Sequence, residues 1–242
     1  MKLNTHVSAD LESLSREALE QVLADMDSAV KARGRFAIAL SGGHTPAKMY
    51  ALWAQNEKYR TETPWDRVHM FWGDERFVPA DDPLSNFRMT REALLSHVPI
   101  PPANVHPAPT NLATPQLAAA AYEADLRKFF GDDLPAFDVT LLGIGPEGHT
   151  ASLFPDSPAL AEKKKWVDAV TVKATPPNRL TFTLPVLNQS RNVYFLAAGQ
   201  EKKEILDALR AEPDPAHSQY PAAHIQPVDG RVTWFLDKPA SL

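Results

Sequence analysis

The chain reads Asp138-Val139-Thr140-Leu141-Leu142-Gly143-Ile144-Gly145-Pro146-Glu147-Gly148-His149-Thr150 a little past its middle. The first part of this segment is an apolar run, which is typical of a strand buried on both faces of a parallel sheet. The second part is a glycine-rich turn that carries a carboxylate and an imidazole. Ligands of such sheets bind just beyond the carboxyl ends of the strands, so we expect Glu147 and His149 to lie at a ligand-binding edge.

His149 is the candidate general base in this turn. Imidazole changes its protonation state near neutral pH, and it can therefore take a proton from water under ordinary conditions. The alternative is that His149 is only a polar residue of a surface loop. Its position at a predicted strand end, between glycines, favours the catalytic interpretation.

The glycines of the turn also match the dinucleotide-binding pattern Gly-x-Gly-x-x-Gly, and Asp168 follows about twenty residues later. A pyrophosphate-binding turn opens a helix, whereas Pro155 and Pro158 break any helix soon after His149. The match is therefore accidental in our interpretation. We expect no nicotinamide, flavin or other cofactor.

Helical and strand patterns alternate along the rest of the chain. Apolar residues recur at helical spacing from a cap at Ser8 to Gly34, which is suited to end a helix in the left-handed conformation. Further helices are expected from about residue 46 and over residues 86–96, 116–130 and 201–210, and strands over residues 36–40, 68–72, 139–142, 167–172, 180–183, 193–197 and 232–236. This alternation predicts an α/β fold in which helices cover a parallel sheet.

The composition limits the classes of protein that need to be considered. A chain of 242 residues, 44% hydrophobic and 23% charged, can bury one sizeable core, and we expect a single domain over residues 1–242. The net charge of -5 gives no electrostatic reason to expect nucleic acid, and the lysines at 163–165 are interpreted as solvated loop. The absence of cysteine excludes disulfides and thiolate chemistry.

The amino-terminal residues 1–6 lack the apolar stretch of a signal peptide, and no apolar run approaches the length that spans a membrane. We therefore expect a cytoplasmic protein without a membrane or nucleic-acid partner. A monomer or a small homo-oligomer is expected.

A second predicted strand end carries Ser41-Gly42-Gly43-His44-Thr45-Pro46. Glycines let backbone amides approach an anion, hydroxyls add donors, and Pro46 suits the first turn of a helix whose positive end faces the ligand. We predict that this segment is a phosphate cradle. It differs from the Walker loop, because the lysine and the longer spacing are missing. The alternative is a tight strand-to-helix turn without a ligand. His44 is expected to be a solvated loop residue.

A third predicted strand end carries Gly73-Asp74-Glu75-Arg76, and Ser85-Asn86 begins the next helix. A carboxylate and a guanidinium beyond a buried strand can hold sugar hydroxyls and an anion or a developing oxyanion, which makes Asp74 and Arg76 candidate site residues. The alternative is a surface ion pair. Further along the chain, Arg179 and Lys202 each place a cation near a predicted edge of the sheet.

Together these segments resemble the 6-phosphogluconolactonase family and the wider group that includes glucosamine-6-phosphate deaminase. The resemblance implies a Rossmann-like open, mainly parallel sheet flanked by helices. It also implies hydrolysis of 6-phospho-D-glucono-1,5-lactone to 6-phospho-D-gluconate in the oxidative pentose phosphate pathway, with this phosphorylated sugar lactone as the small-molecule partner. The matching motifs occur in the family's order over nearly the whole chain: Ser41-Gly42-Gly43-x-Thr45-Pro46, Gly73-Asp74-Glu75-Arg76 with Val78-Pro79 and Ser85-Asn86, Gly143-x-Gly145-x-x-Gly148-His149-Thr150-Ala151-Ser152-Leu153-Phe154-Pro155, Pro176-Pro177-x-Arg179 and Gly199-x-x-Lys202.

The resemblance also implies roles for the catalytic residues. His149 would take a proton from the attacking water and later return one to the departing ring oxygen, and Arg76 would stabilise the oxyanion. Glu147 or Asp74 would orient His149 or the sugar hydroxyls. The family usually has aspartate at the position of Glu147, so the contact made by this longer carboxylate is an open question.

The phosphate would rest on residues 41–45, with Arg179 as a fork and Lys202 as a point charge. No metal is expected, because the histidines lack the His-Glu-x-x-His spacing and Asp81-Asp82 is more simply a solvated turn. No serine nucleophile is expected either, since no Gly-x-Ser-x-Gly elbow is present.

Within the resembling group, the deaminases carry a glutamate five residues after the matching histidine, where it assists ring opening. Here that position is Phe154. The lactonase interpretation is therefore favoured. Two alternatives stay open, namely a glucosamine-6-phosphate deaminase or isomerase and a non-catalytic sensor of sugar phosphates.

Overall fold

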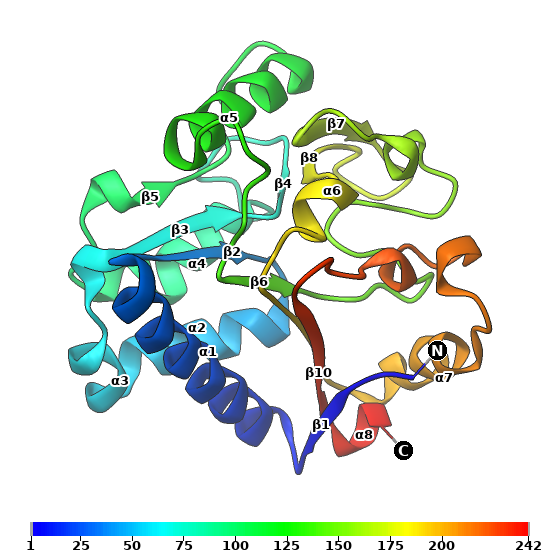
Figure 1. Ribbon diagram of the computed structural model, residues 1–242, viewed down its shortest axis with the longest axis horizontal. Coiled ribbons are helices and arrows are strands. Elements are labelled where there is room, and N and C mark those ends of the chain that lie inside the picture. Colours follow the sequence, from blue (N-terminus) through cyan, green and yellow to red (C-terminus); the bar gives the residue numbers. More distant parts are fainter. Residues whose placement is uncertain (1, 242) are drawn as a thin grey trace.

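The central sheet of the computed structural model, which describes residues 2–241, contains seven strands (Figure 1). They lie in the order β1-β10-β9-β6-β2-β3-β5, and all neighbours are parallel. The predicted parallel sheet is therefore confirmed. Its strands are β1 (Thr5–Ser8), β2 (Phe36–Leu40), β3 (Val68–Trp72), β5 (Val105–His106), β6 (Val139–Leu142), β9 (Asn192–Ala197) and β10 (Arg231–Asp237).

Three further strands form a separate antiparallel sheet in the order β4-β8-β7. They are β4 (Asp74–Arg76), β8 (Asn178–Phe182) and β7 (Val167–Thr171). Two of these strands were predicted, but β4 was not, because three residues carry no periodicity. Only Gly73 separates β3 from β4, so the chain passes from one sheet to the other at this glycine.

Helices cover both faces of the central sheet (Figure 1). The first two helices pack on one face, whereas α7 and the antiparallel sheet, with α5 packed on β7 and β8, belong to the core on the other. The 3-10 segment Leu95–His97 replaces the end of the helix predicted over 86–96. The helices are α1 (Leu11–Arg33), α2 (His44–Gln55), α3 (Glu57–Glu62), α4 (Asn86–Ala93), α5 (Pro115–Phe130), α6 (Leu184–Leu187), α7 (Lys203–Ala211) and α8 (Lys238–Ser241).

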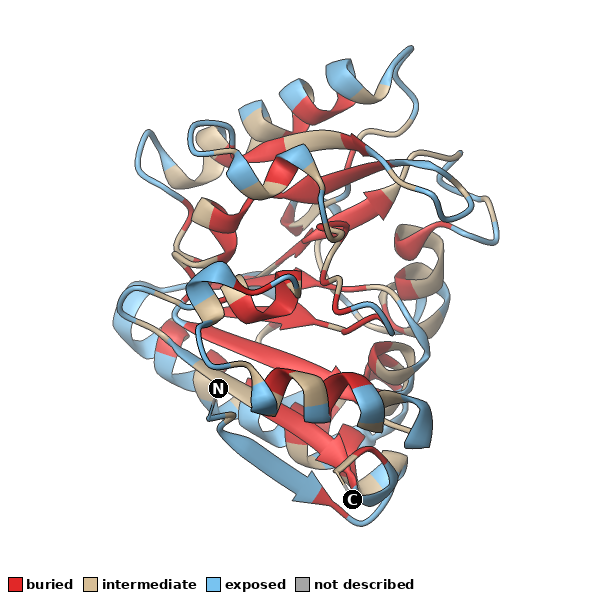
Figure 2. Ribbon diagram, turned by 90° about the vertical axis from the view of Figure 1, so that its right-hand side faces the viewer, coloured by how far each residue is buried: buried red, intermediate tan, exposed pale blue. Residues whose placement is uncertain are grey.

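The strands in the middle of the molecule are coloured as buried in Figure 2, and β2, in which every residue is buried, shows why. Phe36 and Ile38 pack into the core beneath α1 and α2, whereas Ala37 and Ala39 face the core beneath α5. Successive residues of a strand point to opposite faces, so a run without polar residues serves two cores at once. The apolar run that predicted this strand is therefore explained by its central position.

The first helix begins two residues later than a cap at Ser8 would require. Asp10 is the actual cap, and its carboxylate accepts a hydrogen bond from the backbone N–H of Ser13 at 2.8 Å. Ser8 instead ends β1, which pairs with β10. The short β1 is largely exposed and has no apolar alternation, so only its tertiary pairing reveals it. Gly34 ends α1 with φ 72°, as predicted.

No helix within residues 2–241 is both long enough and apolar enough to cross a membrane.

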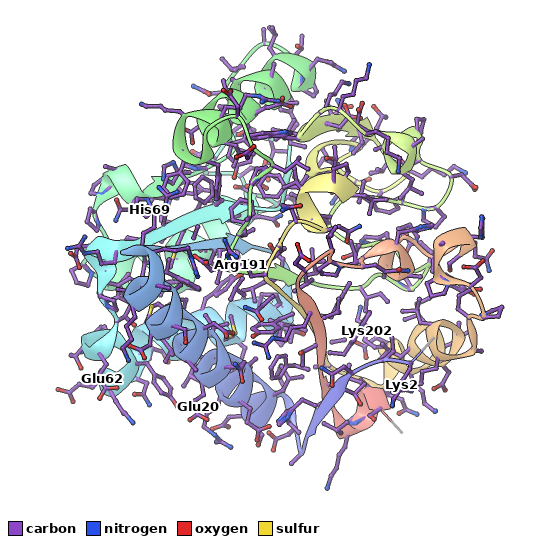
Figure 3. All side chains as sticks on the ribbon, viewed as in Figure 1. Lys2, Glu20, Glu62, His69, Arg191 and Lys202 are labelled. Atoms are coloured by element: carbon purple, nitrogen blue, oxygen red, sulfur yellow. The ribbon has the colours of Figure 1, made fainter. Side chains whose placement is uncertain are left out.

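His69 on β3, labelled in Figure 3, makes the stability of this fold dependent on pH. Its Nδ1 lies 3.4 Å from Nε2 of His106, and its ring packs on Phe129. Burial, and next His106 and Arg35, lower the pKa of His69 from 6.5 to about 4. The unfolded chain therefore binds this proton at higher pH than the folded protein does. The free energy of unfolding should fall as pH drops from about 6.5 towards about 4.

Replacement of His69 by phenylalanine should remove this part of the pH dependence. We expect the difference in free energy of unfolding between about pH 7.5 and about pH 5 to be smaller in His69→Phe than in the wild-type protein, as measured by urea unfolding. His97→Phe, which changes an exposed histidine, is the control and should keep the wild-type difference. An unchanged difference in His69→Phe would contradict the prediction.

Candidate active site

A cavity of about 540 Å³ opens where β2 and β6 end. The chain leaves β2 towards β3 on one side and leaves β6 towards β9 on the other, so the strand order reverses between these neighbours. This is where open α/β sheets bind ligands. Most of the predicted site residues line the cavity, namely Ser41, Gly42, Gly43, Thr45, Asp74, Arg76, His149, Arg179 and Lys202. Glu147 is outside this lining but contacts His149.

The glycine-rich turn after β6 folds back on itself and delivers the imidazole. The backbone N–H of Gly145 donates to the carbonyl of His149 at 2.9 Å, and that of Gly148 donates to the carbonyl of Gly145 at 3.0 Å. A Cβ on Gly145 would collide with the imidazole of His149 and with the carboxylate of Glu147. Gly145 therefore gives the two side chains the space in which they meet. No helix begins at this turn. The match to the dinucleotide-binding pattern therefore lacks the helix that such a site requires, as expected.

Glu147 is the carboxylate beside the candidate base. Its Oε2 lies 3.0 Å from Nδ1 of His149, although the angle lies outside the range of a hydrogen bond. Burial raises the pKa of the Glu147 carboxyl, but its own backbone N–H, His149 and Lys202 outweigh burial and hold the pKa below its usual value. A carboxylate this close favours a proton on Nδ1, which leaves the lone pair on Nε2.

The predicted phosphate cradle forms the start of α2. Gly43 is the residue before the helix and has φ 107°, a conformation that favours glycine. The Oγ of Ser41 is buried and has no hydrogen-bond partner within the described residues. A buried hydroxyl without a partner is costly, and a bound anion would supply one. His44 is exposed, as expected, but it is the first residue of α2 and lines the cavity, so the prediction of a loop residue is wrong.

Tyr50 fixes the backbone of the cradle through hydrogen bonds to Ser41. Its hydroxyl donates to the carbonyl of Ser41 at 3.0 Å and accepts from the N–H of Ser41 at 3.1 Å. Both backbone groups of Ser41 are thereby satisfied within the core. The cradle is thus fixed in position before any ligand binds.

Asn86 connects the cradle to the residues of β4. A Cβ on Gly42 would collide with the side chain of Asn86, so this glycine serves packing. The Nδ2 of Asn86 donates to the carbonyl of Asp74 at 3.0 Å, and its Oδ1 accepts from Nη1 of Arg76 at 2.7 Å. One buried amide therefore sets the relative positions of three predicted site residues.

The carboxylates of Asp74 and Glu75 are buried, so the alternative of a surface ion pair is wrong. Asp74 accepts a hydrogen bond from Oγ of Ser152 at 2.7 Å. Glu75 accepts from the N–H groups of Asn86 and Phe87 at the start of α4, and burial raises the pKa of its carboxyl. Asp74 faces the cavity, whereas Glu75 is an anchor for the helix.

Arg76 and Arg179 are direct partners in the antiparallel register of β4 and β8. Both line the cavity, and Arg179 is buried. Burial, and next the neighbouring Arg76, lower the pKa of Arg179. Two adjacent guanidinium groups repel one another unless an anion offsets their charge. Their placement supports an anion site on this side of the cavity.

Lys202, labelled in Figure 3, also lines the cavity. Its Nζ donates to the carbonyl of Ile144 at 2.9 Å, which ties the loop after β9 to the turn after β6. The N–H of Gly199 in the same loop donates to the carboxylate of Asp237, which is buried at the end of β10. The cation is therefore held at the cavity by two neighbouring strand ends.

The sequence analysis missed the residues that support the site. Asn86 was recognised only as the start of a helix, and Tyr50 has the apolar spacing of an ordinary core residue. Ser152 lies in a loop without a periodic signal. Their contacts join different helices, strands and loops, so the periodicity of a single element does not reveal them.

Comparison with known proteins places these features in one family. The family model described as glucosamine-6-phosphate isomerases/6-phosphogluconolactonase matches residues 9–234. A 6-phosphogluconolactonase from Synechocystis sp. is 46% identical over 231 residues, covering 94% of this chain and 92% of the relative. A 6-phosphogluconolactonase from Mycobacterium tuberculosis is 39% identical over 251 residues, covering 100% of this chain and 98% of the relative.

Solved structures agree with the sequence relatives. The 6-phosphogluconolactonase from Trypanosoma brucei has a TM-score of 0.84 at 32% identity, covering 99% of this chain and 97% of that one. A monomeric glucosamine-6-phosphate deaminase has a TM-score of 0.80 at 21% identity, covering 98% of both chains, and shows the shared fold alone. The match of the family model and the identity along nearly the whole length establish that the chain belongs to the family of glucosamine-6-phosphate isomerases and 6-phosphogluconolactonases.

Proposed function

We propose that this protein hydrolyses 6-phospho-D-glucono-1,5-lactone to 6-phospho-D-gluconate, a reaction of the oxidative pentose phosphate pathway. The observation that carries the proposal is one cavity lined by both the His149 imidazole and a cradle and cations suited to phosphate. The relatives with high identity and coverage are themselves 6-phosphogluconolactonases.

In the proposed reaction, Nε2 of His149 removes a proton from water while the water oxygen attacks the lactone carbonyl carbon. The carbonyl oxygen becomes an oxyanion, which Arg76 stabilises. The bond from this carbon to the ring oxygen then breaks, and His149 returns the proton to the departing oxygen. Water is thus added across the ester bond, and the acid that forms loses its proton to solvent.

Glu147 supports His149 in both steps of this reaction. Its carboxylate favours the proton on Nδ1, which keeps the lone pair on Nε2 for the water. It also stabilises the positive imidazolium that exists between the two proton transfers. Asp74 lines the cavity and is held there by Ser152 and Asn86, so we assign it to the sugar hydroxyls.

The phosphate binds to residues 41–45, Arg179 and Lys202 in this proposal. Backbone amides at the start of α2 and the Ser41 hydroxyl supply donors, and the two cations supply charge. The buried guanidinium of Arg179 is suited to two parallel hydrogen bonds with phosphate oxygens.

The deaminase alternative is disfavoured at Phe154. At this position, where the resembling deaminases carry a glutamate for ring opening, the phenyl ring stacks on His149. Release of ammonia from glucosamine 6-phosphate would identify a deaminase. A non-catalytic sensor would bind 6-phosphogluconate without accelerating loss of the lactone.

The direct test is decay of the phosphorylated lactone at mildly acidic pH, where spontaneous hydrolysis is slow, with and without the protein. We expect decay well above the uncatalysed rate in the presence of the protein. Equal decay in both samples, together with tight binding of 6-phosphogluconate, would instead support the sensor.

Hydrolysis should be independent of added or removed metal ions. The proposal assigns proton transfer to His149 and charge stabilisation to protein donors, so no step requires a Lewis acid. Prolonged treatment with a chelator should leave kcat and KM unchanged. Loss of activity on chelation, with recovery on adding zinc or magnesium, would transfer the activation of water to a metal site.

The number of domains, the cellular location and the oligomeric state are also proposals. We propose that residues 1–242 form one domain, which the two cores on either side of a shared sheet support. A cytoplasmic location and a monomer or small homo-oligomer remain predictions from the sequence.

A further inference from the structure

The ring of Phe154 lies flat against the imidazole of His149. Their centroids are 4.1 Å apart and their planes differ by 12°. Gly145 packs against Nδ1 and Cε1 of the same imidazole, and Glu147 lies at Nδ1. Three neighbours therefore surround the candidate base, and of the two that contribute a side chain, Glu147 has a part in the proposed reaction whereas Phe154 has none.

A tight and strained turn brings Phe154 back onto the imidazole. The N–H of Leu153 donates to the carbonyl of Thr150 at 2.9 Å, which reverses the chain directly after His149. Within this turn, Ala151 has φ 48°, a left-handed conformation that is unfavourable for a residue with a Cβ. Strain of this kind persists where the surroundings impose it and is concentrated at functional sites. It occurs here in the segment that delivers Phe154.

We infer that Phe154 is a positioning residue for the hydrolytic reaction. A stacked phenyl ring blocks rotation of the imidazole about its χ2 bond, because a turned imidazole would overlap with it. The stack therefore fixes the plane of the imidazole, and within that plane Glu147 at Nδ1 selects the orientation that directs Nε2 to the reacting water. A smaller aliphatic side chain leaves the imidazole free to adopt orientations in which Nε2 does not meet the water.

This inference rests on the proposed role of His149 as general base, and kinetics of two kinds of variant test it. Phe154→Leu should lower kcat about tenfold or more while KM changes by less than about twofold, because the loss concerns orientation and not binding. Phe154→Tyr and Phe154→Trp keep a flat ring and should recover most of kcat. A wild-type kcat in Phe154→Leu, or an equal loss in all three variants, would overturn the inference.

Phe129→Leu is the matched control. Phe129 is also a partly buried phenylalanine that packs on a histidine, but that histidine is His69 on β3 and not His149. We expect its loss to lower the melting temperature about as much as Phe154→Leu does and to leave kcat unchanged. If Phe129→Leu lowered kcat equally, general destabilisation would explain both effects and the inference would fail.

The ring nitrogens of His149 provide a readout that needs no activity. In protein labelled with nitrogen-15 at histidine, with His149→Ala to assign the signal, we expect one tautomer with the proton on Nδ1 in the wild type and in Phe154→Tyr. Phe154→Leu should show averaged shifts of a mixed population. An unchanged signal in Phe154→Leu would overturn this inference, whereas a wild-type protein without lactonase activity would contradict only the proposed function.

Discussion

His149→Ala should lower kcat for the phosphorylated lactone by about a hundredfold or more, because it removes the base that takes the proton from water. Binding of 6-phosphogluconate, measured by calorimetry, should stay close to the wild-type value. The phosphate contacts of the proposal lie on α2, β8 and the loop after β9 and do not involve the imidazole. The expected signature is thus a loss of turnover without a loss of affinity.

The pH dependence of the rate provides a second check on this variant. A general base must be unprotonated, so the wild-type rate should fall on the acid side, and the residual rate of His149→Ala should lack this fall. The uncatalysed hydrolysis must be subtracted, because it also increases with pH. His97→Ala, at an exposed histidine, is the control and should retain full activity. Near-wild-type turnover in His149→Ala would contradict the assignment of His149 as the general base.

Arg179→Ala should lower kcat/KM for the phosphorylated lactone by about a hundredfold, because charge-assisted contacts to phosphate are among the strong hydrogen bonds. Residual activity towards unphosphorylated gluconolactone should change little. Comparing the two substrates separates a phosphate contact from a contribution to the chemistry. Lys202→Ala should show the same selectivity.

Two further variants control for charge and for folding. Arg179→Lys keeps the positive charge but loses the paired donors of the guanidinium group. Its kcat/KM for the phosphorylated lactone should lie between those of the wild type and Arg179→Ala. Arg67→Ala removes an exposed arginine that pairs with Asp66, and it should leave the activity towards both substrates unchanged. Equal losses on both substrates in Arg179→Ala would show that this residue serves the fold or the chemistry.

The central strands were predictable because their signal is local. The residues of β2 and β6 are buried on both faces, so each strand appears as an uninterrupted apolar run, and the predicted bounds agree with the structure. The glycines that follow them identify the strand ends at which ligands bind. The sequence alone was therefore sufficient to propose His149, the cradle and a parallel sheet.

The separate antiparallel sheet could not be predicted in the same way. Strand β4 has three residues, and its pairing with β8 joins positions about a hundred residues apart. That pairing places Arg76 beside Arg179, which neither segment indicates by itself. Likewise, β1 is recognisable only through its parallel pairing with β10.

The sequence by itself determined the class of fold, the strand ends that hold the site and the chemical types of side chain available there. The spacing of apolar residues and the positions of glycines are properties of short stretches of sequence, so they are recognisable without the tertiary structure. Only the tertiary structure decided that Glu147 and not Asp74 meets His149, that Asn86 joins Asp74 to Arg76, and that Phe154 covers the imidazole. The contacts of Asn86 join a helix to a strand of the second sheet, and the contacts of His149 depend on how the turn after β6 folds back, so their geometry exists only in the folded chain.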